Sequence, residues 1–525
     1  MREHLAKIVI VGLMLLVVGV PFVLRPDDAS GTMTEGDAPA DRLIIYTPHN
    51  EQIRFEMAQG FNDWRSTQGL SPVVFDWRAS GGTSDLRKTI LAQFEAKARK
   101  GREDEGVGAD LFFGGGEYDH NKLAAGLKIE RDGEEVKVPV AVAANLPEGL
   151  LEEVFPSPTI GGERLYHADK LWVGTALSSF GIVYNRDLLL MLDLKAPTTW
   201  ADLADPRYQN WLALADPAHS GSIGATFNTV LKRTGWTEGW SMMRRVFANA
   251  RYFSNSASKV PVDVSSGEAA AGMCIDFYGR TQAGAVAAAG WSGDVDGEST
   301  SRVGYTDPVV DGRSMTATTA DPVTLLRGAP DRETAEQFIA WLLTKESQRL
   351  WQAELGTEAG PVRYELRRQP IRPDLFTAEE KQTWTDPQID PYPTAVPIMA
   401  GMPDFFSAVS PISQAMAINV HKDLIEAWRA ILRTPDDHPD KAEMLRLFDL
   451  MPPQLTLTWP DGLEDNWRAA VGEVDHPRHE EAAQVLADFM ADFNGRDDEQ
   501  KLKDKLTWTL FFRDNYRQIA SMGER

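Results

Sequence analysis

Short apolar runs alternate with helical patterns over roughly the first two thirds of the chain. The runs have the length and apolar character of buried strands and lie at 43–46, 73–77, 110–113, 171–175, 182–184, 212–215, 273–277 and 322–326. Between them, apolar residues recur at helical spacing, as at Leu86, Ile90 and Phe94 and again at Ala335, Phe338 and Leu342. The alternation predicts an α/β fold with mostly parallel sheets.

The pattern changes after about residue 367. Strand-like runs stop, and helical patterns follow at 416–432, 441–450, 480–493 and 503–519. Prolines cluster between 368 and 393, so we place a domain boundary near 368–390. Residues 390–525 are therefore predicted to form a mainly helical C-terminal extension. Its apolar stripes predict a core, but they leave open whether the extension packs against the rest of the chain or lies under a partner.

The first 25 residues combine a positive flank with an apolar run. Arg2 and Lys7 precede the 17-residue run 8–24, which predicts an N-terminus in the cytoplasm and the rest of the chain outside. The run is short for a spanning helix and long for a signal peptide. The small-x-small site at Ala38 and Ala40 lies far beyond it, so we favour an uncleaved membrane anchor at 1–25 over a cleaved signal. The polar composition of residues 26–40, rich in Asp, Gly, Pro and Ala, predicts a flexible linker.

Composition and charge narrow the class of protein. The chain is 43% hydrophobic and 25% charged, as expected of a globular body, and its formal net charge is −23. This acidity argues against nucleic acid as a partner, although a local site can still be basic. Cys274 is the only cysteine, which excludes an intrachain disulfide. No cysteine closely follows the apolar run, which excludes a lipidated one there.

Polar residues follow the end of the first predicted strand, where His49, Asn50 and Glu51 precede a helical pattern. In α/β sheets, ligands bind beyond the carboxyl ends of the strands, and a helix start offers free N–H groups there. Asn50 is also a common N-cap residue. For this turn alone, an ordinary strand-to-helix connection is the simpler interpretation.

The same arrangement recurs at four later strand ends. Glycine lets a backbone approach a ligand, and hydroxyl side chains can donate hydrogen bonds to it. The loops carry Ser80, Gly81, Gly82, Thr83 and Ser84; Gly115, Gly116 and Glu117; Ser220, Gly221 and Ser222; and Asp276 and Tyr278. Each loop alone is ordinary turn chemistry, but together they predict one ligand-binding cleft. No phosphate-loop, HExxH or GxSxG motif and no nucleophile–base pair is visible, so an enzyme is not expected.

Six stretches resemble, in order, the extracellular solute-binding proteins of ABC importers, in the cluster that includes ferric-ion-binding proteins. They are LIIYTPHNEQI, ADLFFGGGEYD, FGIVYNRDLL, PTTWADLADPRYQNWLALADPAHSGS, GEAAAGMCIDFYG and TADPVTLLRGAPDRETAEQFIAWLLTKESQRLW, within about 41–368. The resemblance implies a type II-like periplasmic-binding-protein fold whose two lobes close on a ligand. It places the hinge crossings near 172–185 and 302–323. The lobes are then 41–175 with 315–367, and 180–305.

The resemblance also implies a ligand set. Iron-binding members of the cluster hold ferric ion with a histidine and an acid from one lobe and two consecutive tyrosines from the other. His49 matches the histidine, Glu117 is a shifted match for the acid, and Tyr278 matches one tyrosine. Phe277 stands where the other tyrosine is expected and cannot bind a metal, which puts iron in doubt because a hard trivalent ion prefers oxygen donors. In those members an anion completes the coordination shell, and its binding site corresponds to Ser220, Gly221 and Ser222 here.

Three classes of function stay open on these grounds. The first is a membrane-tethered component on the periplasmic side that passes ferric ion, with a bound anion and no covalent cofactor, to an ABC permease and ATPase. Its variant binds a phosphate, phosphonate or carboxylate solute without metal on the two glycine–hydroxyl loops. The second is a ligand sensor or envelope protein whose C-terminal helices contact a partner. The third, least favoured, is a hydrolase.

Overall fold

The computed structural model describes residues 41–131, 133–290, 292–295, 298–396, 402–460, 462–463 and 478–523. The expected anchor at 1–25 and linker at 26–40 lie outside these residues. Within the described part of the chain, no helix is both long and apolar enough to cross a membrane.

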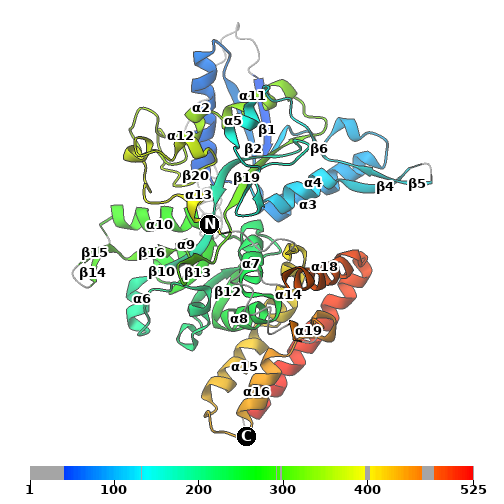
Figure 1. The fold of residues 1–525 in the computed structure, drawn as a ribbon, viewed down its shortest axis with the longest axis vertical. Helices are drawn as coiled ribbons and strands as arrows, with labels where there is room; N and C mark the ends of the chain where they lie inside the picture. Colours follow the sequence, from blue (N-terminus) through cyan, green and yellow to red (C-terminus); the bar gives the residue numbers. More distant parts are fainter. Residues whose placement is uncertain are drawn as a thin grey trace, which may run out of the picture.

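Two mixed β-sheets organise the molecule, one in each of two α/β lobes (Figure 1). The first sheet has the strand order β2-β1-β3-β19-β9-β20, with β6 beside β19. β1 pairs in parallel with β2 and β3, whereas β19 runs antiparallel to β3 and β9. The bounds are β1 (Asp41–Tyr46), β2 (Val73–Arg78), β3 (Leu111–Phe113), β6 (Ala141–Val142), β9 (Val173–Ser178), β19 (Thr319–Leu326) and β20 (Gln369–Pro370).

The second sheet has the order β12-β11-β13-β10-β16, in which β10 runs antiparallel to both of its neighbours. Its bounds are β10 (Phe180–Asn185), β11 (Leu212–Ala215), β12 (Ala250–Ser254), β13 (Ala271–Ile275) and β16 (Val303–Thr306). The prediction of mostly parallel sheets is therefore wrong. The strands that connect the lobes enter each sheet from the opposite direction, which makes both sheets mixed. The two-lobe α/β fold with a mainly helical C-terminal region is confirmed.

Helices cover both faces of the first sheet because strand residues alternate between the faces. Phe113 packs in the core with Ile53, Met57 and Phe61 of α2 (Glu51–Thr67). Its neighbour Phe112 packs in a separate core on the other side. There it meets the Leu86, Ile90 and Phe94 stripe of α3 (Thr83–Ala98) and part of α4 (Glu117–Ala125). The first core also holds α11 (Arg332–Leu342).

The second lobe and the linking segments carry the remaining helices and hairpins. α7 (Gly221–Thr234), α8 (Trp236–Asn249), α9 (Lys259–Ser266) and α10 (Asp276–Ala288) pack around the second sheet. Shorter helices are α5 (Leu150–Val154), α6 (Arg186–Met191), α12 (Lys345–Arg349) and α13 (Pro391–Thr394). Further strand pairs are β4 (Leu127–Arg131) with β5 (Glu134–Val138), β7 (Thr159–Ile160) with β8 (Glu163–Arg164), β14 (Ser292–Val295) with β15 (Glu298–Ser301), and β17 (Val309–Val310) with β18 (Arg313–Ser314).

The chain passes between the sheets twice in the region of the hinge. The first passage is at Ser179, between β9 and β10, and the second is the segment between β16 and β19. The proline-rich segment at 368–390 is part of the first lobe rather than a boundary. Its β20 pairs with β9, Trp384 bridges to Ala353, and the Tyr392 hydroxyl donates to the Ile371 carbonyl.

Two predicted elements contain a change of backbone conformation that the sequence did not indicate. The apolar run at 273–277 is not all strand, because β13 ends at Ile275 and Asp276 begins α10. The helical pattern at 416–432 is two helices, α14 (Phe406–Met416) and α15 (His421–Arg433), separated by a short 3-10 turn. In both places apolar residues continue across a change of backbone conformation, so periodicity alone does not mark the end.

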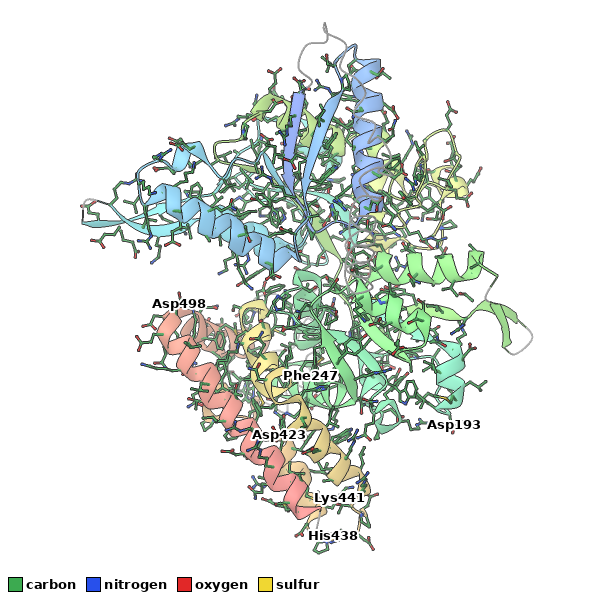
Figure 2. All side chains as sticks on the ribbon, turned by 180° about the vertical axis from the view of Figure 1, so that it is seen from behind. Asp193, Phe247, Asp423, His438, Lys441 and Asp498 are labelled. Atoms are coloured by element: carbon green, nitrogen blue, oxygen red, sulfur yellow. The ribbon has the colours of Figure 1, made fainter. Side chains whose placement is uncertain are left out.

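The C-terminal extension packs against the second lobe. α19 (Asp498–Met522) lies along α14 and α15, α16 (Lys441–Asp449) lies beside it, and α18 (His479–Gly495) precedes it. In Figure 2, the helix that begins at Asp498 runs past Asp423 along this side of the molecule. The Trp236 indole donates to the Leu455 carbonyl at 2.9 Å, and the Trp428 indole donates to Asn249 at 3.1 Å. The extension and the second lobe therefore share one core.

Candidate functional site

Three loops of the first lobe meet at the carboxyl ends of β1, β2 and β3. A Cβ atom on Gly114 would lie 2.4 Å from His49 Nε2, and one on Gly115 would lie 2.2 Å from Thr83 Cγ2. Both glycines also have positive φ angles, of 97° and 110°. Gly114 and Gly115 are thus required where they stand, because the imidazole and the threonine methyl occupy the space that side chains would need.

A buried ion network lies beneath these loops. His49 Nε2 is 2.8 Å from Asp321 Oδ2, and Arg368 Nη1 is 3.0 Å from the same oxygen. Arg368 Nε and Nη2 also donate to Ser178 Oγ at 3.0 and 2.7 Å. Asp321 and Arg368 are only 1% and 2% exposed. The network joins β19, β9 and the residue before β20, so it fixes the strands next to the hinge.

The neighbours of Asp321 keep its carboxyl group ionised. Burial by itself would raise the pKa of this carboxyl, but Arg368 and then His49 outweigh burial and lower the pKa to about 2. The Gly115 N–H adds a hydrogen bond of 2.9 Å to the other carboxylate oxygen. Asp321 is therefore ionised at neutral pH, and the site holds a buried carboxylate–guanidinium pair.

Sequence reasoning missed both partners of His49. Asp321 lies within TADPVTLL, a stretch that carried the resemblance, and Arg368 lies at the start of the predicted boundary. A carboxylate inside an otherwise apolar strand was an available signal, because a buried charge needs a partner. For Arg368 the sequence held no comparable signal.

The second lobe brings two aromatic rings to this arginine. The Arg368 guanidinium carbon lies 4.7 Å from the centroid of the Phe277 ring, and the Tyr278 ring lies 4.3 Å from that of Phe277. Burial, opposed by Arg368 and assisted by Asp321, raises the pKa of Tyr278 to about 12. Tyr278 is thus a neutral phenol at neutral pH. Phe277, which breaks the expected tyrosine pair, instead offers a π face to a cation.

The two glycine–hydroxyl loops come from different lobes and touch. A Cβ atom on Gly82 would lie 2.1 Å from the carbonyl oxygen of His219. His219 Nδ1 is 3.0 Å from Asp85 Oδ2, and Lys88 Nζ donates to the Ala218 carbonyl at 2.9 Å. The N-termini of α3 and α7 therefore face the same region, as the prediction of one cleft requires.

These helix starts differ in how their N–H groups are satisfied. The N-cap residue of α3 is Gly82 and that of α4 is Gly116, and neither has a side-chain cap. In α7, Ser220 Oγ accepts a bond of 3.4 Å from Ile223 N–H and lies 3.1 Å from Ser222 Oγ. Thr83, Ser84 and Gly221 are buried, whereas Ser80 and Gly81 are exposed. Uncapped helix N-termini offer N–H groups and partial positive charge to an anion.

Three predicted site residues have other partners, and a fourth is exposed. Asn50 accepts a bond of 3.1 Å from Ile53 N–H, so it is the N-cap of α2, and Glu51 is exposed. Glu117 accepts from Asn121 of its own helix at 3.0 Å, and burial raises the pKa of its carboxyl. Asp276 is bonded by Arg280 at 3.2 Å and lines a cavity behind the hinge.

The expected metal ligands have separate partners. His49 contacts Asp321, Glu117 contacts Asn121, and the Tyr278 ring packs at a tilt against Phe277. No cluster of three or more His, Cys, Asp or Glu side chains suited to a metal occurs in the part of the chain that the structure describes. Arg368 Nη1 lies 3.4 Å from His49 Nε2, which places a positive charge where the imidazole would meet a metal. His49 Nε2 is thus engaged by Asp321 and Arg368, whose own charges pair with each other at 3.0 Å.

Residues 162–363 match the family model described as bacterial extracellular solute-binding protein. The phosphoglycerate transport regulatory protein PgtC of Salmonella typhimurium is 32% identical over 106 residues, which is 20% of this chain and 27% of that protein. The match thus spans about a quarter of that relative. An uncharacterized protein of Haemophilus influenzae is 25% identical over 324 residues, covering 61% of this chain and 79% of that one.

Solved structures match a larger share of the chain, at lower sequence identity. The periplasmic binding protein AfuA from Actinobacillus pleuropneumoniae, with fructose-6-phosphate bound, is 16% identical with a TM-score of 0.49. That match covers 74% of this chain and 97% of AfuA. Iron-bound HitA from Pseudomonas aeruginosa is 17% identical with a TM-score of 0.44, covering 68% of this chain and 92% of HitA.

Proposed function

Because this chain carries a domain of the bacterial extracellular solute-binding proteins, we propose that it binds an organic anion between its lobes and delivers it to an ABC importer. The anion is phosphorylated or carboxylated and binds without metal. The protein then works outside the cytoplasmic membrane with a permease and an ATPase, and residues 1–25 hold it to that membrane. It acts as a binding protein rather than as an enzyme.

One observation carries the choice of an anion. Arg368, 2% exposed, contacts Asp321 and Ser178 of the first lobe and the Phe277 ring of the second. A guanidinium placed where two lobes meet is suited to planar, charge-assisted recognition of carboxylate or phosphate. The uncapped start of α3 and the Ser220 loop support the same choice, since both offer donors to an anion.

Ferric ion with a bound anion is the second candidate. It is favoured because His49 and Tyr278 both border Arg368, one from each lobe. It is disfavoured by the arginine charge, by Phe277 in place of a phenolate, and by the engagement of Glu117 with Asn121. An iron site here would need the arginine to move away from the imidazole.

A ligand sensor is the candidate of another class. The C-terminal helices add a large surface to the second lobe, and one relative carries the description phosphoglycerate transport regulatory protein. Genes for a permease and an ATPase beside this one would favour import. A neighbouring sensor kinase gene would favour sensing, with the same ligand in the same cleft.

The first experiment is isothermal titration of the purified full-length chain with 3-phosphoglycerate, fructose 6-phosphate, citrate and inorganic phosphate. We expect saturable binding of at least one of them. Arg368→Gln should weaken that binding by about 10- to 150-fold, since a hydrogen bond to a charged group contributes about 1.5–3 kcal/mol. The control is Arg42→Gln, which removes an exposed arginine paired with Asp76.

Elemental analysis of the same preparation separates the two ligands. Stoichiometric iron with a visible tyrosinate-to-iron band that disappears in Tyr278→Phe would replace the anion proposal with the ferric one. Iron-free protein whose affinity for every anion tested is unchanged by Arg368→Gln would overturn both.

A further inference from the structure

A cavity of about 260 Å³, lined by both polar and apolar side chains, lies behind the hinge. Consecutive residues of an extended strand point to opposite faces. Arg368 therefore reaches Ser178 and His49 on one side, while Gln369, the next residue, lines the cavity on the other. Ser178, which accepts hydrogen bonds from Arg368, also lines the cavity, so the cavity adjoins the Arg368 network although neither Arg368 nor His49 lines it.

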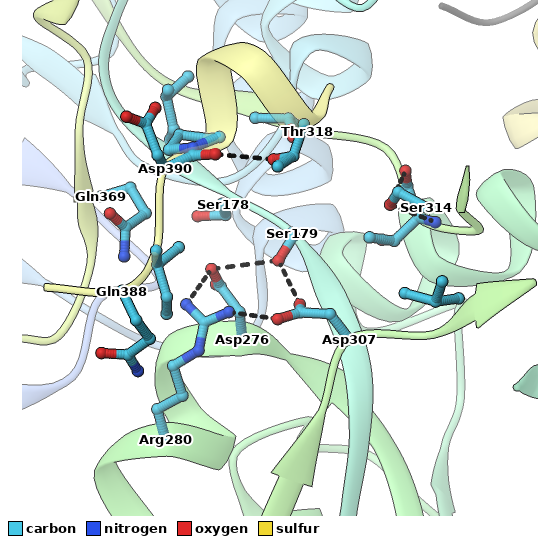
Figure 3. A pocket seen from close by; sticks show the side chains of 16 residues that line it. Ser178, Ser179, Asp276, Arg280, Asp307, Ser314, Thr318, Gln369, Gln388 and Asp390 are labelled. Carbon is cyan, nitrogen blue, oxygen red and sulfur yellow. Dashed lines mark hydrogen bonds and ion pairs between the residues drawn. The ribbon is translucent and has the colours of Figure 1, made fainter. Parts of the chain in front are cut away.

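Both lobes and both hinge passages contribute to the walls of this cavity (Figure 3). The first lobe provides Gln369 of β20, and the segment after it provides Gln388 and Asp390. The second lobe provides Asp276 and Arg280 of α10. Serine and threonine residues of the two passages also line the cavity, together with the apolar residues Leu177, Val309, Ile389 and Pro391. An occupant would consequently touch parts of the chain that move relative to one another when the lobes open.

One side of the cavity is a closed hydrogen-bond network. Ser179 Oγ lies 3.0 Å from Asp307 Oδ1 and 3.4 Å from Asp276 Oδ2. Arg280 donates to Asp276 at 3.2 Å and to Asp307 at 2.7 Å. Figure 3 shows these four side chains facing one another. Because one guanidinium pairs with two carboxylates, this wall is firmly placed and still offers acceptor oxygens to a ligand.

The opposite side holds an amide with no protein partner. Gln369 is 2% exposed, and neither its Nε2 nor its Oε1 has a hydrogen-bond partner among the described residues. Gln388 and Asp390 lie along the same side (Figure 3). A buried amide without partners loses the hydrogen bonds that it would make to water, so such a group in a folded protein calls for a bound molecule.

We propose that this hinge cavity is a second binding site, for a small neutral polyhydroxy molecule of polyol or monosaccharide size. Hydroxyl groups both donate and accept, so they match an amide whose NH2 group and carbonyl oxygen are both without partners. They also donate to the carboxylates of Asp307 and Asp390. Nothing in this inference depends on the ligand of the Arg368 site.

Charge and size set the class of ligand. Asp276 and Asp307 share Arg280, and Lys381 lies 3.0 Å from Asp390, so the carboxylate charge is largely compensated within the protein. A second anion would be repelled by these three carboxylates. A cation would have to compete with the two cationic side chains that already pair with them, Arg280 and Lys381. The volume lies just below the roughly 300–1,000 Å³ of pockets for drug-sized ligands, which selects a small molecule.

The test is calorimetric titration of the full chain with glycerol, myo-inositol and D-glucose. We expect at least one of them to bind saturably, with its affinity reduced about tenfold or more in Gln369→Leu, which keeps the size of the side chain and removes its polar atoms. Gln388→Ala, at an exposed lining residue that folding does not depend on, should weaken the same binding. Gln382→Ala, also exposed but outside the cavity, is the matched control.

Each other outcome overturns the proposal. If none of the three probes binds saturably, the cavity holds only water. If a probe binds equally well to the Gln369→Leu and Gln388→Ala variants, its site is elsewhere. If inorganic phosphate binds and the Gln369→Leu variant loses that binding, the ligand class is wrong. Ser220→Ala should leave polyol binding unchanged, so failure of the anion proposal and failure of this one remain distinguishable.

Discussion

Asp321 and Arg368 each compensate the buried charge of the other. A carboxylate in the interior costs several kcal/mol unless a countercharge and hydrogen bonds compensate it. Here Arg368 lies 3.0 Å from Asp321, and the Gly115 N–H lies 2.9 Å from its second oxygen. His49 then packs edge-on against the Phe113 ring, with centroids 4.5 Å apart. The imidazole is thereby held in one orientation beneath the loops of the first lobe.

This pairing predicts a specific acid sensitivity. Burial opposes ionisation of Asp321, but Arg368 and His49 lower its pKa to about 2 from the ordinary 3.8. A lowered folded-state pKa stabilises the fold above about pH 4, and that contribution is lost as the pH falls from about 4 to about 2. Its size is about 2 kcal/mol. Urea unfolding of the wild type and of Asp321→Asn at pH 5 and pH 2.5 measures it.

The expected result is a smaller acid-induced loss of unfolding free energy in Asp321→Asn than in the wild type. Asp76 provides the control, because it is a partly exposed carboxylate paired with Arg42, and Asp76→Asn should leave the wild-type loss unchanged to within about 1 kcal/mol. Parallel pH curves for the wild type and Asp321→Asn would show that the network contributes nothing to acid stability.

At the scale of elements, two helices start at the contact between the lobes. α3 begins after Gly82 and α7 after Ser220, and the backbone of Gly82 lies against that of His219. The two loops approach more closely than side chains on Gly82 would allow. The contact is therefore made by backbone, which leaves the helix N–H groups of both lobes near one another.

Gly82→Ala tests whether this contact is needed for ligand binding. Gly82 has φ −80°, which alanine adopts without strain, so the effect of the substitution is steric. Its Cβ would lie 2.1 Å from the His219 carbonyl oxygen and would hold the lobes apart. Overpacking costs about 1–3 kcal/mol, so affinity for the cleft anion should fall about 5- to 150-fold. Calorimetric titration measures the change.

Gly495→Ala is the matched control, because a Cβ there meets no atom within 4 Å. It should bind the anion as the wild type does. If Gly82→Ala also binds as the wild type does, the two loops do not need to touch in the ligand-bound state.

At the scale of the whole molecule, the C-terminal extension belongs to the second lobe and reaches the first. Phe406 of α14 stacks on Tyr118 of α4, with ring centroids 4.2 Å apart and planes 19° from parallel. A Cβ atom on Gly224 of α7 would lie 2.7 Å from Phe406. The ring is thus seated on the second lobe and touches the first, so it joins the lobes when they are together.

Phe406→Ala is expected to weaken ligand binding without unfolding the extension. The aromatic pair contributes about 0.5–1.5 kcal/mol beyond area burial, and its loss favours separated lobes. Affinity for the cleft anion should therefore fall about 2- to 12-fold. Phe511→Ala, at a partly buried ring on α19, should leave affinity unchanged. Equal affinity in the Phe406→Ala variant and the wild type would mean that the extension plays no part in closure.

The sequence by itself determined the elements and the fold class. Stripes such as Leu86, Ile90 and Phe94 lie within one element, so burial imposes their spacing directly on the sequence. The loops at His49, Gly82 and Ser220 were also predictable, since a strand, a turn and a helix start follow one another in the chain. The ends of elements that fall inside an apolar stretch, as at Ile275 and Met416, were not predictable from the sequence.

Only the tertiary structure decided what these residues contact. His49 and Asp321 are 272 positions apart, and no local pattern relates them to Arg368. Asp276 lines the hinge cavity, whereas Tyr278 packs against Phe277, because nearby residues of a helix point in different directions. The C-terminal stripes indicated burial but not against which surface. Pairings between distant segments depend on how whole lobes pack, and a hydrophobic pattern specifies only that a face is buried.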